Sequence, residues 1–257
     1  MKRFASCFFQ LWWIAACALA MVWQTRLLVS EVAPNPWFDG FVFGATVFGY
    51  NFAAPAARRW PAWALGLGAG YCFTQLPLAQ QLAALLPASI WIAYYGLHRP
   101  EANGLRRYPV LKPLAVALAW AWVTVWLPLP LSAWTAAVGL FVGRAAFIFA
   151  LALAYDLCDR HYDRSKGLDT LVLQLGVGRS LRLIDAALLL AAGAIPANVL
   201  AGRYGAAAAL ALGLSLLFSR WTIRQLARRP EWGNWRKVLI DSLMLLQLAL
   251  VAGALLA

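Results

Sequence analysis

Long apolar runs alternate with short polar segments along most of the chain. A helix needs about 20 mostly apolar residues to cross a hydrocarbon core about 30 Å thick. Nine runs approach that length, and they cover residues 5–25, 37–54, 61–77, 80–97, 113–131, 134–156, 181–202, 204–221 and 237–256. The pattern predicts an all-α integral membrane protein with nine transmembrane helices in one multi-pass domain, residues 1–257.

The composition is that of a membrane protein. Apolar residues make up 63% of the chain and charged residues 12%, whereas soluble domains average about 45–50% and about 25%. The N-terminal run has the charge order of a signal peptide, but no small-residue cleavage site follows, so we expect it to remain as the first helix. The four cysteines show no CxxC spacing, which argues against a zinc site or a disulfide framework.

The positive charges indicate the orientation. With the N-terminus in the cytoplasm, all but three of the 22 Lys and Arg residues fall on the cytoplasmic side. The exceptions are Arg26 and Arg203 on the outer side and Arg144 within a span. This asymmetry follows the positive-inside rule and predicts nine crossings of a cell membrane, which we take to be a bacterial inner membrane. The same charges attract anionic membrane lipid, and their spread over several short loops argues against a nucleic-acid partner.

Four of the ten acidic residues lie in one segment, residues 155–176, at the end of the sixth apolar run. Asp156, Asp159 and Asp163 stand at positions i, i+3 and i+7, so they share one face of a helix that continues past the membrane boundary. Three converging carboxylates repel one another, and a divalent cation is their natural counter-charge. Oxygen ligands suit Mg²⁺, which often completes its coordination with substrate phosphates. The spacing therefore predicts a magnesium site for a phosphorylated, membrane-soluble ligand.

A simpler interpretation of the same segment is a charged helix end. The aspartates would then pair with basic residues of the same loop, namely Arg160, Arg164 and Lys166. Surface ion pairs of this kind are common and contribute little to stability. We also expect His161 in this loop to be solvated and Thr170 to cap the following helix.

The residues around the aspartates form a longer pattern. It reads Tyr155-Asp156-x-x-Asp159-x-x-x-Asp163-x-x-x-Gly167-x-x-Thr170-Leu171, followed by Leu175-Gly176. This pattern resembles the second aspartate-rich motif of the UbiA superfamily of intramembrane prenyltransferases. The basic stretch at residues 105–112 is similar to the loop that precedes the fifth helix in that family.

The resemblance implies nine transmembrane helices, built as two pseudo-repeated four-helix units plus a ninth helix. Members of the family transfer a polyprenyl group from its diphosphate to a small acceptor, often an aromatic ring, in a helix-shielded cavity. They hold Mg²⁺ between two aspartate-rich motifs, one after the second helix and one after the sixth. In this chain the resemblance assigns Asp156, Asp159 and Asp163 as metal ligands and catalytic residues. It assigns to the diphosphate Asn51, Arg106, Arg107 and Lys112, and we add Arg58 and Arg59 as diphosphate ligands, because arginine binds phosphate through two parallel hydrogen bonds.

The first aspartate-rich motif is degenerate. The family pattern is roughly Asn-x-x-x-Asp-x-x-x-Asp, and this chain keeps Asn51 but has Pro55 and Arg59 at the acidic positions. No shift of register restores the motif, because no acidic residue lies between Asp39 and Glu101. Arginine binds phosphate through two parallel hydrogen bonds, so a cationic replacement is compatible with a diphosphate ligand.

The two halves of the chain differ in their acidic residues. Tyr50-Asn51 ends the second span as Tyr155-Asp156 ends the sixth, which is expected of a duplicated four-helix unit. On this overlay Arg58 stands opposite Asp163. The second half keeps its implied metal ligands, and the first half lacks them.

Three functions are compatible with these features. In the first, the protein is a prenyltransferase that binds a polyprenyl diphosphate with one Mg²⁺ and with Arg58 or Arg59 on the phosphate. In the second, it binds an isoprenoid or its diphosphate without catalysis. In the third, it is a transporter, which the scarcity of ionisable groups within the spans argues against. The prenyltransferase is our primary prediction.

Arg144 is a cation within the sixth span, before Asp156 by 12 residues and therefore about 18 Å deeper in the membrane. An unpaired cation at that depth is costly. We predict that Arg144 faces the bundle interior and donates to backbone carbonyls or to a polar side chain. The candidate partners are Asn51, Gln75 and Tyr95.

Overall fold

The structure is a computed structural model that describes residues 2–29, 33–52, 60–95, 104–229, 233 and 235–256. Within these ranges the fold is all-helical, as predicted, and contains no β-strand. The nine α-helices of these ranges are α1 (Lys2–Leu28), α2 (Pro36–Phe52), α3 (Trp60–Thr74), α4 (Leu78–Tyr95), α5 (Leu111–Ala121), α6 (Val138–Ser165), α7 (Leu171–Leu200), α8 (Ala206–Arg228) and α9 (Trp235–Leu256). A 3₁₀ turn, η1 (Leu105–Arg107), precedes α5. A π-helical turn, η2 (Trp122–Trp126), and a second 3₁₀ turn, η3 (Leu131–Ala133), lie between α5 and α6.

The helices are those of a multi-pass membrane protein. Five qualify as membrane spans by length and composition: the Gln10–Leu28 part of α1, together with α6, α7, α8 and α9. α5 and η2 form one shorter apolar segment, Leu111–Trp126. α2 and α3 have 17 and 15 residues, fewer than the roughly 20 that a crossing requires. Nine crossings and a cytoplasmic N-terminus therefore stay predictions.

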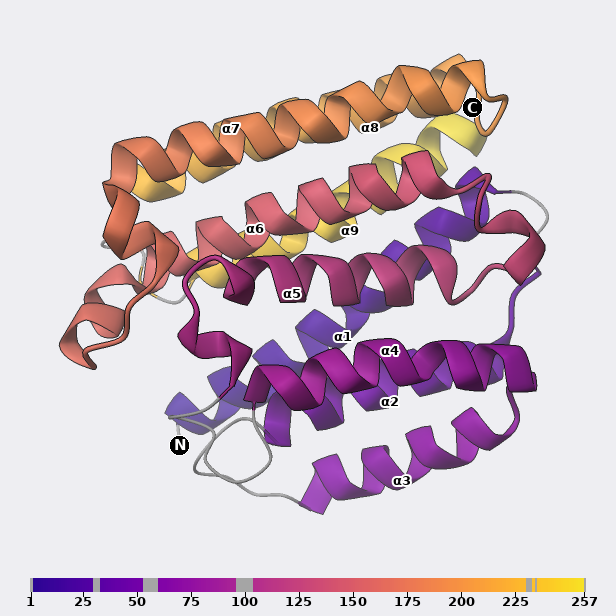
Figure 1. Ribbon diagram of the computed structural model, residues 1–257, viewed down its shortest axis with the longest axis horizontal. Coiled ribbons are helices and arrows are strands. Elements are labelled where there is room, and N and C mark those ends of the chain that lie inside the picture. The colour runs from indigo at the N-terminus through magenta and orange to yellow at the C-terminus, as the bar shows by residue number, and fades with distance from the viewer. Residues whose placement is uncertain are drawn as a thin grey trace.

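Consecutive helices run in alternating directions (Figure 1), and most consecutive pairs pack against each other in one bundle. The start of α1 lies at the same end as the ends of α2, α4, α6 and α8 and the starts of the helices that follow them. Most of the described Lys and Arg residues belong to this end, in agreement with the charge asymmetry of the sequence. α2 packs most extensively on α3, and α6 on α7, at corresponding places in the two halves, while α9 packs on both α1 and α8.

Small residues let α6 lie close to α7. A Cβ at Gly143 would lie 3.1 Å from the Cβ of Ala194, and one at Gly139 would lie 2.9 Å from Oδ1 of Asn198. Such close approach favours helix packing in membranes, where burial of apolar surface against lipid gives little gain. The largest buried apolar cluster adds contacts from α1, α8 and α9. This packing fixes the position of α6, whose far end carries the aspartates.

Candidate functional site

The acidic segment forms the last turns of α6 and the bend into α7. α6 continues past the aspartates to Ser165, as predicted. Gly167 then adopts a left-handed conformation with φ of 65°, which glycine reaches without the strain that a Cβ causes. Thr170 caps α7 by accepting a hydrogen bond from the amide of Leu173, which confirms its predicted role. Gly176, with φ of 72°, bends α7 near its start.

A cavity of about 420 Å³ lies beside the aspartates at this end of the bundle. α1, α2, α4, α5, α6 and α9 all contribute to its lining. Its charged side chains are Lys112 of α5, Asp156 and Asp159 of α6, and Lys237 and Asp241 of α9. Two of the three aspartates predicted from spacing thus share one cavity with one of the implied diphosphate ligands. We call this space the ligand cavity.

Each of the two α6 aspartates in the ligand cavity, Asp156 and Asp159, is held by a lysine from another helix. Nζ of Lys112 lies 2.6 Å from Oδ1 of Asp156, and Nζ of Lys237 lies 2.6 Å from Oδ1 of Asp159. These partners come from α5 and α9 and not from the basic residues of the same loop, so the simpler interpretation does not account for these two ion pairs. The lysines are only 18% and 20% exposed. Partial shielding from water makes such pairs stronger than ordinary surface pairs.

The rest of the cavity wall is aromatic and apolar. Tyr50, Tyr95, Trp120 and Tyr155 supply aromatic surface, and aliphatic side chains such as Leu151 complete the wall. Aromatic and aliphatic surface with a few polar groups at one place is typical of small-molecule sites. The cavity therefore suits an apolar chain that carries a polar head group.

Tyr50 and Tyr155 occupy corresponding positions in the two halves of the chain, and both line the ligand cavity. Nε2 of Gln10 donates a hydrogen bond to the Tyr155 hydroxyl at 2.6 Å. Nζ of Lys237 lies 5.0 Å from the centroid of the same ring, within the range of a cation–π contact. These contacts hold Tyr155 in the wall next to the ion pairs.

The described residues do not form a magnesium site of the predicted kind. Among them, no group of three or more His, Cys, Asp or Glu side chains is arranged to hold a metal ion. Asp163 is buried but does not line the ligand cavity. Asp156 and Asp159 already hold ammonium groups. This arrangement does not fit one Mg²⁺ held by three carboxylates, and magnesium stays an implication of the resemblance.

The other implied diphosphate ligands are not gathered in the ligand cavity. Asn51 is half-buried at the end of α2 and Arg107 is exposed in η1, and neither lines the cavity. Arg58 and Arg59 lie outside the described residues, as does the side chain of Arg106. Lys112, at the start of α5, is the one implied diphosphate ligand whose described side chain lines the ligand cavity.

Two residues of α9 in the ligand cavity are absent from the predicted site. Lys237 and Asp241 stand four residues apart and both line the cavity. A signal for them exists in the sequence, because they are charged residues at i and i+4 on one face of an otherwise apolar span. The ion pair between Lys237 and Asp159 has no such signal in the sequence, since it depends on how α9 packs against α6.

Arg144 faces the bundle interior, as predicted, and is 3% exposed. Its guanidinium donates to the backbone oxygen of Met21 at 3.0 Å, to Oγ1 of Thr124 at 3.2 Å and to Oε1 of Gln24. The predicted bond to a backbone carbonyl is confirmed. The three candidate side-chain partners are wrong, because α1 and η2 supply the acceptors at this depth in the bundle.

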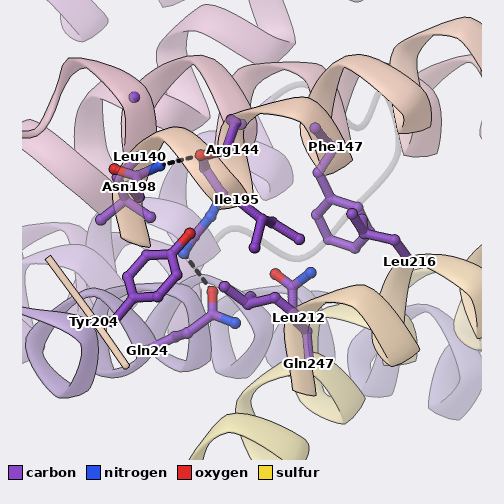
Figure 2. Close-up of a pocket in the computed structure, with 14 residues that line it drawn as sticks. Gln24, Leu140, Arg144, Phe147, Ile195, Asn198, Tyr204, Leu212, Leu216 and Gln247 are labelled. Atoms are coloured by element: carbon purple, nitrogen blue, oxygen red, sulfur yellow. Dashed lines mark hydrogen bonds between the residues drawn. The ribbon is translucent and has the colours of Figure 1, made fainter. Parts of the chain in front are cut away.

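A small cavity of about 40 Å³ adjoins Arg144, and Figure 2 shows the arginine reaching Gln24, with Asn198 and Tyr204 in the same wall. Among the described residues no carboxylate forms an ion pair with this arginine. Burial raises the pKa of Tyr204 to about 12, so its phenol stays protonated and supplies no negative charge. Small-molecule sites usually exceed about 300 Å³. This cavity therefore has room for water, and Arg144 serves to join α6 to α1 and η2.

No protein-family model matches the sequence, and no curated protein sequence matches it. Solved structures resemble it in fold. The apo structure of a UbiA homologue from Aeropyrum pernix K1 matches with a TM-score of 0.65 at 18% sequence identity, over 95% of this chain and 96% of that one. A structure of digeranylgeranylglyceryl phosphate synthase matches with a TM-score of 0.63 at 12% identity, over 94% of each chain. The chain thus has a UbiA-like membrane fold along nearly its whole length, as the pattern around the aspartates predicted.

Proposed function

We propose that the chain is a divergent member of the UbiA superfamily that binds a prenyl diphosphate in the ligand cavity and transfers the prenyl group to a small acceptor. The observation that carries this proposal is the position of Lys112 and Lys237 beside an aromatic and apolar wall. The cavity volume of about 420 Å³ is that of a small-molecule site. In a membrane protein, such a site favours a lipid-soluble ligand with an anionic head group.

The two lysines are the proposed binding groups for the diphosphate. Each ammonium has three N–H donors, so a lysine that contacts one carboxylate oxygen keeps donors for phosphate oxygens. A charge-assisted hydrogen bond contributes about 1.5–3 kcal/mol. The carboxylate partners hold both ammonium groups in place before the ligand arrives.

The diphosphate needs more positive charge than the two lysines supply. Three aspartates line the same cavity, so the described charges there do not by themselves attract an anion. The sequence offers further polar and cationic groups for this role. The additional proposed ligands are Asn51, Arg58, Arg59, Arg106 and Arg107.

Transfer breaks the bond between prenyl C1 and the diphosphate oxygen and forms a bond between C1 and the acceptor, which gives up one proton to the released diphosphate. Negative charge builds on the departing diphosphate, and fixed cations stabilise it more strongly in the transition state than in the bound state. Lys112 and Lys237 are proposed for this role. The apolar wall excludes water, which would otherwise capture the allylic cation. Magnesium is assigned no step, because the carboxylates of the cavity already hold the two lysines.

A second candidate function is binding of a prenyl diphosphate without transfer. It is favoured by the lack of any acidic residue between Asp39 and Glu101, where the resemblance places the first metal-binding motif. Lysine and arginine can hold the ground state of a diphosphate through charge-assisted bonds. They provide less stabilisation of the leaving group than a pair of metal ions does.

Purified protein in lipid nanodiscs distinguishes the two candidates. Equilibrium binding of farnesyl diphosphate is measured first, followed by release of diphosphate in the presence of simple phenols as acceptor probes. Saturable binding with release supports transfer, and saturable binding without release supports the second candidate. Lack of saturable binding contradicts both. Lys166→Gln is the control for a general effect of surface charge, because Lys166 is exposed and does not line the cavity.

A further inference from the structure

Asp241 is a buried acidic residue in the ligand cavity that has no role in the proposed binding of the head group. It lies on α9, is 5% exposed and lines the cavity. Sγ of Cys17 donates to its backbone oxygen at 3.3 Å, a contact that does not involve the carboxylate. Among the residues that the structure describes, this carboxylate is attracted to Lys237, one turn away on α9, and the hydrogen bonds and ion pairs of those residues include none to it.

The surroundings of Asp241 favour a positively charged ligand group. A buried carboxylate is costly unless a cation or a hydrogen-bond donor compensates it. Tyr50, Tyr155 and Trp120 line the same cavity as Asp241. Aromatic rings attract cations through their faces, and a bound cation favours the ionised form of a neighbouring carboxyl group. A carboxylate among aromatic rings is therefore suited to an organic cation.

The position of Asp241 relative to Lys237 relates this cation to the head group. Asp241 stands four residues after Lys237, which is about one helical turn, or about 6 Å along α9. Lys237 is one of the two lysines proposed to hold the diphosphate. The first carbon of a prenyl chain is one bond away from a phosphate oxygen. If Lys237 binds the head group, the first carbon of the prenyl chain lies in the part of the cavity that Asp241 lines.

We propose that Asp241 and the neighbouring tyrosine rings form a cation subsite for the allylic carbon of a prenyl diphosphate. This inference rests on the proposed function, since it takes a prenyl diphosphate as the ligand of the cavity. When the C1–O bond breaks, both bonding electrons leave with the diphosphate oxygen, and the positive charge spreads over the allylic carbons. No proton moves in this step. The lysines stabilise the departing anion, while Asp241 stabilises the cation that remains.

An ammonium analogue tests the subsite without turnover. Farnesylamine carries a positive nitrogen on C1, and farnesol is its uncharged counterpart. Binding of both is measured with full-length protein in nanodiscs, in the presence of inorganic diphosphate. We expect wild type to bind farnesylamine at least about 10-fold more tightly than farnesol, and Asp241→Asn to lose most of this preference. Ser242→Ala is the control, because Ser242 bonds the backbone of Val238 and does not line the cavity.

Farnesyl diphosphate binding is measured on the same samples. Loss of the ammonium preference in Asp241→Asn, with farnesyl diphosphate affinity kept within about threefold, supports the subsite. An equal preference in wild type and variant, or no preference in wild type, overturns it and leaves the proposed function standing. Absence of farnesyl diphosphate binding in wild type overturns both. If Asp241→Asn does not fold, the comparison of the two probes in wild type decides.

Discussion

Lys237, near the start of α9, forms an ion pair with Asp159, near the end of α6, with 2.6 Å between Nζ and Oδ1. The pair joins two helices that are far apart in the sequence. It places an ammonium group against a carboxylate for which the resemblance implies a metal ion. Because α9 also packs on α1 and α8, this contact connects the last helix of the bundle to the ligand cavity.

Removal of this ion pair should show coupling between its two members. Lys237→Met leaves the partly shielded carboxylate of Asp159 without its cation, and we expect a loss of about 1–2 kcal/mol in the free energy of unfolding. Lys237→Met combined with Asp159→Asn should cost less than the sum of the single changes, since neither charge then remains. A double-mutant cycle of thermal unfolding measures this coupling. Additive effects would show that the contact contributes nothing.

Metal removal should leave ligand binding largely intact. Because Lys112 and Lys237 occupy Asp156 and Asp159, we expect the affinity for farnesyl diphosphate in EDTA to stay within about threefold of that in Mg²⁺. Equilibrium binding in the two buffers provides the measurement, with Ca²⁺ as a further control. Loss of binding in EDTA that Mg²⁺ restores would mean that a metal ion displaces the lysines, as the resemblance implies.

Filling the cavity should weaken binding of the prenyl chain but not of the head group. Ala152 is a half-buried residue of α6 that lines the ligand cavity. Ala152→Phe places a ring in this space, and we expect the affinity for farnesyl diphosphate to fall at least about 10-fold. Inorganic diphosphate should bind as it does to wild type. Leu189→Phe, at an exposed position of α7, is the matched control. An equal loss of affinity for farnesyl diphosphate and for inorganic diphosphate would contradict the assignment of this part of the cavity to the prenyl chain.

Arg144 should matter for stability and not for ligand binding. Arg144→Ala leaves acceptors on Met21, Gln24 and Thr124 without their donor and creates a void, so we expect a loss of about 2–4 kcal/mol in the free energy of unfolding. Arg144→Lys should not restore this stability, because an ammonium lacks the planar fork of a guanidinium. Thermal unfolding and farnesyl diphosphate binding are compared with Arg203→Ala, a change at an exposed position. A selective loss of ligand affinity would contradict the structural role.

The end of α6 is the part of the site that the sequence predicts best, because its signals are local. The spacing of Asp156 and Asp159 places both on one helical face, and both line the ligand cavity. The cap at Thr170 follows from residue type and position alone. The overlay of the two halves pairs Tyr50 with Tyr155, and the structure places both side chains in the wall of the ligand cavity.

The contributions of α9 are not predictable in the same way. Lys237 meets Asp159 only because α9 returns against the first helix of the bundle, and no local pattern encodes that approach. The partners of Arg144 show the same limit. Its burial follows from the cost of a cation in lipid, but its acceptors depend on which helices surround α6 at that depth.

Binding of farnesyl diphosphate by a Lys112→Met/Lys237→Met variant tests most directly whether the ligand cavity holds a diphosphate head group. Two charge-assisted bonds of at least about 1.5 kcal/mol each correspond to a loss of at least about 100-fold in affinity. We expect that loss relative to wild type, together with unchanged binding of farnesol, in a variant whose thermal unfolding confirms that it is folded. Equal affinity of the variant and wild type for farnesyl diphosphate would contradict the assignment of Lys112 and Lys237 as the head-group ligands.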